Sequence, residues 1–112
     1  MDLQSTYHNN LNIITVKDAR IDASVAIRFK DAMRAATNEG PPLVVLNLGN
    51  VTFVDSSGLG AIIASMKQLD SNRKLDLACL TPDVAKVFRL TRMDSIFDIH
   101  ENIESLKCRA AG

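Results

Sequence analysis

Two segments near the start of the chain have the residue pattern of β-strands. Residues 11–16, with the sequence LNIITV, are rich in β-branched side chains, which favours a strand. Residues 3–7 predict a shorter strand before it. His8-Asn9-Asn10 lies between the two and predicts a turn, because asparagine tolerates left-handed backbone angles. We therefore expect an antiparallel β-hairpin at the beginning of the chain.

Apolar residues recur at helical spacing in three later segments. The first follows Asp22, a favourable N-cap, and runs to Ala36, before Gly40-Pro41-Pro42 prevents the helix from continuing. The last begins at Thr81-Pro82-Asp83, where a hydroxyl cap, a proline and an acidic residue suit the first turn of a helix. The middle segment carries one apolar stripe, which is formed by Leu59, Ile62, Ile63, Met66 and Leu69.

Strands are expected between and after these helices. Residues 43–48 are almost continuously apolar, as in a central strand that is buried on both faces. Residues 51–54 predict either a short strand or an extended approach to the next helix, and residues 74–80 predict another strand. A short strand at residues 96–99 and a terminal helix at residues 102–107 complete the pattern. The alternation predicts an α/β fold with helices packed on a mixed, mostly parallel sheet.

Composition and charge narrow the range of functions. Residues 1–112 have the length of a single domain, and their formal net charge is zero, so we expect no basic face for nucleic acid and no membrane partner. No apolar stretch approaches the roughly 18 residues that a transmembrane helix needs, and residues 1–10 lack the pattern of a secretory signal. Cys79 and Cys108 fit a reducing compartment better than a disulfide. These features predict a cytoplasmic protein.

The segment Asp55-Ser56-Ser57-Gly58-Leu59-Gly60 places two hydroxyl groups where a strand turns into a helix. A serine hydrolase is not favoured, because its nucleophile elbow requires G-x-S-x-G and the residues before the serines here are Val54 and Asp55. A hydrolase also needs a base. The two histidines, His8 and His100, are expected at the surface rather than in a catalytic site.

A nucleotide site and a metal site also match poorly. Gly58-Leu59-Gly60 resembles the start of a dinucleotide-binding loop, but Ile63 stands at the position of the third glycine, and no lysine follows Gly60 as in a P-loop. No cluster of His, Cys, Asp and Glu has the spacing of metal ligands, so no cofactor is expected. Helix capping by Ser56 or Ser57 would contribute about 1 kcal/mol. Capping alone does not explain two adjacent hydroxyls and two glycines beyond a strand, where α/β proteins tend to place their function.

Four motifs along the chain, taken in order, resemble the STAS domain family, and within it the anti-sigma factor antagonists. They are Ala19-Arg20-Ile21-Asp22 before the first helix, Leu46-Asn47-Leu48, the segment from Phe53 to Gly60, and Thr81-Pro82 with Phe88 in the helix that follows. The central D-S-S-G-L-G block is the most specific of them. The chain departs from the family at Ala19 and at Thr91-Arg92-Met93, where members often carry glycine.

The resemblance implies a binding protein rather than an enzyme. Its partner would be an anti-sigma factor that is also a serine kinase of the GHKL ATPase class. This kinase would phosphorylate Ser56 and thereby release the antagonist, and a serine phosphatase would reverse the modification. The residues expected to bind the partner are Asp22, Asp55, Ser57, Gly58, Leu59 and Gly60, and the two glycines would allow close approach to the backbone.

Three questions stay open at the level of sequence. Asp22 either caps the first helix or orients the loop and contacts the partner. Leu59 either packs in the core or contacts the partner. The main alternative function is that of a non-phosphorylated accessory STAS subunit of a membrane transporter or signalling scaffold, because many domains of this family lack a switching serine.

Overall fold

The computed structural model describes the backbone of residues 1–111 and the side chains of residues 1–107, so the side chain of Cys108 lies outside the described residues. The helices are α1 (Ala26–Ala36), α2 (Ser56–Lys67), α3 (Pro82–Leu90), the short 3₁₀ helix η1 (Met93–Ser95) and α4 (Ile103–Ala111). The strands are β1 (Leu3–His8), β2 (Leu11–Val16), β3 (Arg20–Ile21), β4 (Leu43–Asn47), β5 (Phe53–Val54), β6 (Lys74–Ala78) and β7 (Ile99–His100).

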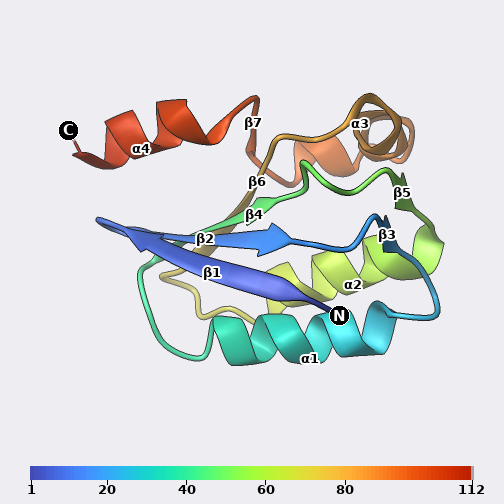
Figure 1. Cartoon of the computed structure of the whole chain (residues 1–112), viewed down its shortest axis with the longest axis horizontal. Helices are drawn as coiled ribbons and strands as arrows, with labels where there is room; N and C mark the ends of the chain where they lie inside the picture. Colours follow the sequence, from blue (N-terminus) through green and yellow to red (C-terminus); the bar gives the residue numbers. More distant parts are fainter. Residues whose placement is uncertain (112) are drawn as a thin grey trace.

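The main sheet has the strand order β1-β2-β4-β6-β7 (Figure 1). The β1–β2 pair is antiparallel, and the other three pairs are parallel. The predicted α/β class, the mixed sheet and the hairpin at the start of the chain are therefore confirmed. The hairpin turn includes Asn9 at φ 53°, the left-handed conformation expected of an asparagine.

Helices cover the two faces of the sheet unequally. α1 and α2 lie side by side across one face, and α4 lies on the other (Figure 1). Along β2, Ile14 and Val16 point into the larger core between the sheet and the helices α1, α2 and α3, whereas Leu11 and Ile13 point toward α4. Leu106 of α4 is buried against this second, smaller core.

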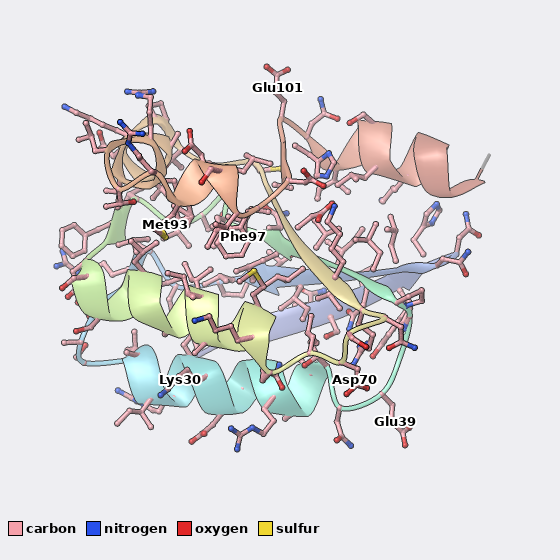
Figure 2. All side chains as sticks on the ribbon, turned by 180° about the vertical axis from the view of Figure 1, so that it is seen from behind. Lys30, Glu39, Asp70, Met93, Phe97 and Glu101 are labelled. Atoms are coloured by element: carbon pink, nitrogen blue, oxygen red, sulfur yellow. The ribbon has the colours of Figure 1, made fainter. Side chains whose placement is uncertain are left out.

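Phe97 holds the segment between α3 and β7 in place. Its ring stacks on that of Phe88 with the centroids 6.0 Å apart, and it is 5% exposed. Figure 2 shows Phe97 pointing into the molecule, while Lys30, Glu39 and Glu101 point outward. The last strand was predicted at residues 96–99, but a turn follows η1 and the strand occupies Ile99–His100 instead.

Two helix starts differ from those expected. α1 begins at Ala26 after Val25, so the prediction that Asp22 caps this helix is wrong. The Asp22 carboxylate instead accepts hydrogen bonds from the backbone N–H and the hydroxyl of Ser24, which produces a turn before the helix. Thr81 does precede α3, but its hydroxyl donates to the Val51 carbonyl at 2.7 Å rather than capping the helix.

Candidate functional site

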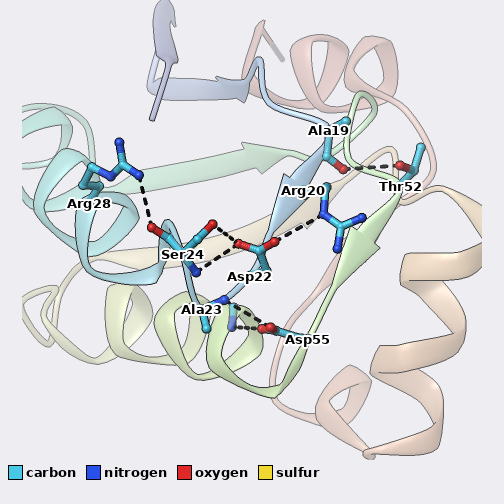
Figure 3. Close-up of polar contacts among 9 residues, drawn as sticks. Ala19, Arg20, Asp22, Ala23, Ser24, Arg28, Thr52 and Asp55 are labelled. Atoms are coloured by element: carbon cyan, nitrogen blue, oxygen red, sulfur yellow. Dashed lines mark hydrogen bonds and ion pairs between the residues drawn. The ribbon is translucent and has the colours of Figure 1, made fainter.

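The site is assembled by β3 and β5, a two-stranded parallel sheet that the sequence did not predict. Its register pairs Arg20 with Phe53 and Ile21 with Val54. A further backbone hydrogen bond joins the Asp55 N–H to the Ile21 carbonyl at 3.4 Å. This pairing brings the loop that leads to α1 against the loop that leads to α2 (Figure 3).

Asp55 connects these two loops through its carboxylate. Oδ1 accepts a hydrogen bond from the Gly58 N–H at 2.8 Å, which makes Asp55 the N-cap of α2. Oδ2 accepts one from the Ala23 N–H at 3.1 Å, in the loop before α1 (Figure 3). The prediction that Ser56 or Ser57 caps the helix is therefore wrong, because Asp55 already fills that position.

Ser56 and Ser57 are the first two residues of α2, and both are exposed. Among residues 1–107, neither hydroxyl is hydrogen-bonded to a side chain that could act as a base. A serine nucleophile requires such a base within hydrogen-bond reach. Both hydroxyls are exposed and free of hydrogen bonds with the described side chains.

The two glycines of the loop occupy very different surroundings. Gly58 is buried, and a Cβ atom there would lie 1.8 Å from the carbonyl oxygen of Ile21, so only glycine lets α2 approach β3 this closely. Gly60 is exposed, and a Cβ atom there would meet nothing within 4 Å. The fold therefore requires Gly58, whereas nothing in the described structure requires Gly60. Leu59 is 8% exposed and packs in the larger core.

Asp22 lies at the adjacent strand end, half-buried and surrounded by donors. The Ser24 hydroxyl donates to it at 2.6 Å, and the Arg20 Nε at 3.2 Å. These contacts lower the pKa of Asp22 below its ordinary value, and the hydrogen bond from the Ser24 hydroxyl contributes most to this shift. The carboxyl group is therefore an anion at neutral pH.

Sequence reasoning missed the pair formed by Arg20 and Phe53. The guanidinium carbon of Arg20 lies 4.3 Å from the centroid of the Phe53 ring, and Phe53 remains 40% exposed. A cation over an aromatic face is a favourable arrangement. No local pattern could have revealed it, because the two residues meet only through the β3–β5 register.

Several other expectations concern chemistry away from this loop. His100 was expected at the surface, but its side chain is 14% exposed and its Nε2 lies 2.8 Å from Oδ2 of the buried Asp76.

No group of three or more potential metal ligands occurs among the described residues. In the same part of the chain, no helix combines the length and the apolar character needed to cross a membrane.

The model of the STAS domain family matches residues 4–106. The chain belongs to the STAS domain family. Its sequence is similar to the anti-sigma-B factor antagonist of Staphylococcus epidermidis, with 26% identity over 105 residues that cover 85% of this chain and 97% of the relative.

Solved structures agree with the STAS fold. An anti-sigma-factor antagonist (STAS) domain protein from Planctomyces limnophilus covers 100% of both chains with a TM-score of 0.88 and 17% identity. The Bacillus cell fate determinant SpoIIAA in its phosphorylated form has a TM-score of 0.68 at 18% identity, and the match covers 96% of this chain and 98% of that chain. At these identities, the likeness concerns the fold alone.

Proposed function

We propose that this STAS protein is an anti-sigma factor antagonist that acts by partner switching. In its unphosphorylated form it binds an anti-sigma factor that is a serine kinase of the GHKL ATPase class. The kinase phosphorylates Ser56 and releases the antagonist, and a serine phosphatase restores the binding form. The protein is thus a cytoplasmic substrate and ligand of enzymes, and it needs no cofactor of its own.

One observation carries the proposal: Ser56 is exposed at the first position of α2 while Asp55 satisfies the helix terminus. A serine that capped the helix would have its hydroxyl engaged, and phosphorylation would remove the cap. Here the hydroxyl can be modified without loss of the Asp55–Gly58 hydrogen bond. The name of the staphylococcal relative and the solved phosphorylated form of SpoIIAA support the same function.

A phosphate on Ser56 should weaken binding to the partner without unfolding the domain. A phosphate on Ser56 adds a charge of about −1.5 to −2 at pH 7. At the N-terminus of α2 this charge interacts favourably with the helix dipole, by about 0.3–1 kcal/mol, so the domain stays folded. At a packed interface, the same charge beside Asp55 and Asp22 costs several kcal/mol through repulsion and lost hydration. Since about 1.4 kcal/mol changes affinity tenfold, phosphorylation switches binding off.

The proposed partner surface surrounds the exposed serines. Ser57 and Gly60 lie on the accessible side of α2, and Asp22 and Asp55 border the loop. Gly60 allows the partner to approach the helix backbone closely, since nothing in the described part of the chain occupies the space beside it. Gly58 and Leu59 act indirectly, because both are buried and determine how α2 sits against β3 and the core.

The decisive experiment compares the two serines, because each is the control for the other. Phosphopeptide mapping of the protein from its native cells, with and without stress, should find phosphate on Ser56 whose occupancy changes. The variant Ser56→Ala should bind the kinase permanently, Ser56→Asp should bind it weakly, and Ser57→Ala should still switch. If neither serine is ever phosphorylated and all three variants bind alike, the switch is excluded and an accessory role is favoured.

A further inference from the structure

A second candidate site lies at the opposite end of the parallel strands. It is a cavity of about 330 Å³ that begins at the first residues of β2, β4 and β6, which are Leu11, Leu43 and Lys74. The proposed switch, by contrast, follows β3 and β5. Leu106 of α4 forms part of the cavity wall. The cavity therefore lies under α4 on the face of the sheet that α1 and α2 do not cover.

The cavity has one apolar side and one polar side. Leu11, Pro42, Leu43 and Leu106 provide the apolar surface. Lys74, Asp76, Asp98 and His100 provide the polar surface. The side chains of Lys74 and Asp98 are 57% and 62% exposed and form the rim, whereas that of Asp76 is only 5% exposed and lies at the bottom.

Asp76 is the unusual member of this group. Its Oδ2 lies 2.8 Å from His100 Nε2, but its Oδ1 is buried and has no hydrogen-bonding partner in the described structure. Lys74 Nζ lies 3.4 Å from this oxygen and forms an ion pair with it, while its hydrogen bond is made with Asp98. A buried carboxylate oxygen that accepts no hydrogen bond is rare, and a ligand, an ion or a water molecule can supply the missing donor.

We propose that this cavity binds a small organic cation, with a primary ammonium group on a compact apolar body. The ammonium group donates a hydrogen bond to Asp76 Oδ1, and its carbon atoms lie against the leucines. Two carboxylates and one lysine give the polar surface one more acidic than basic side chain, which favours a cation over an anion. The volume lies within the range of small-molecule sites.

This inference is independent of the proposed switch. Because Leu106 is the only buried side chain among the described side chains of α4, a ligand in contact with it would also strengthen the attachment of this helix. The proposal therefore predicts that amide exchange slows in α4 when the ligand binds. The Ser56 loop should be unaffected in the same experiment.

The test uses benzylammonium as the cationic probe and benzyl alcohol as its neutral isostere. Both are titrated into the full ¹⁵N-labelled chain, and amide shifts are followed by NMR. Benzylammonium should cause saturable shifts at Leu11, Leu43, Lys74 and Leu106, and benzyl alcohol should not. If the alcohol binds equally well, or if neither probe saturates and only water occupies the site, the proposal is overturned.

Two variants with opposite expected effects make the test specific. Asp76→Asn should weaken benzylammonium binding by about tenfold or more, because it removes the charged acceptor. Lys74→Met should strengthen binding by about two- to fivefold, because it removes a competing cation at an exposed position. Asp83→Asn, an exposed position in α3, should leave binding unchanged. If Asp76→Asn fails to fold, Lys74→Met decides the question, and an unchanged or weaker affinity of that variant excludes the site.

Discussion

Gly58 and Gly60 offer a direct test of how α2 is positioned, because the same substitution should have opposite effects two residues apart. In Gly58→Ala, the new Cβ would lie 1.8 Å from the Ile21 carbonyl oxygen and 2.7 Å from its carbonyl carbon. These are backbone atoms of β3 and cannot rotate away. In Gly60→Ala, the new methyl group would contact nothing within 4 Å.

The expected magnitudes follow from two contributions. Replacing glycine by alanine inside a helix stabilises the protein by about 0.5–1 kcal/mol, and both variants gain this amount. Only Gly58→Ala also forces α2 away from β3, and overpacking of this kind costs about 1–3 kcal/mol, or more where the backbone must move. The difference between the two variants in free energy of unfolding therefore isolates the contact with Ile21.

Urea unfolding followed by far-UV circular dichroism measures this difference. We expect Gly60→Ala to unfold at a higher urea concentration than the native protein, and Gly58→Ala at a clearly lower one, with similar slopes. If Gly58→Ala proves as stable as Gly60→Ala, then α2 is not held against β3 by this close approach. Reduced kinase binding by the stable Gly60→Ala variant would in addition support the proposed approach of the partner to this helix.

Three further substitutions test other parts of the structure. Asp55→Ala should lower the free energy of unfolding by about 1–2 kcal/mol, because it removes the cap of α2. If this loss is no larger than that of Ser57→Ala, Asp55 is not the cap. Arg92→Gly should raise the free energy of unfolding by about 0.5–1 kcal/mol in thermal unfolding, because Arg92 adopts the left-handed conformation at φ 61°, which glycine accepts without strain. Any destabilisation would argue against strain at this position. Leu106→Ala should lower the free energy of unfolding by about 2 kcal/mol or more and reduce the helical signal of α4. Unchanged amide exchange in residues 103–107 would refute the role of Leu106 as an anchor of this helix.

Much of the secondary structure follows from patterns that are local in the chain. The β-branched run of residues 11–16, the apolar run from residue 43 and the helical stripe that begins at Leu59 each specify an element, because the spacing of apolar residues decides which backbone conformation can bury them. The D-S-S-G-L-G block also pointed to the correct family. These features required no knowledge of contacts between distant segments.

The tertiary structure decided which residue performs which task. Asp55 rather than a serine caps α2, and Gly58 is required by a carbonyl group of Ile21, in a strand that is remote in sequence. Asp76 and His100 likewise meet only because β6 and β7 are neighbours. Periodicity reports whether a side chain faces the core, but not which group it will find there. Hydrogen bonds, steric limits and ion pairs between distant residues are decided only when the strands take their order and register.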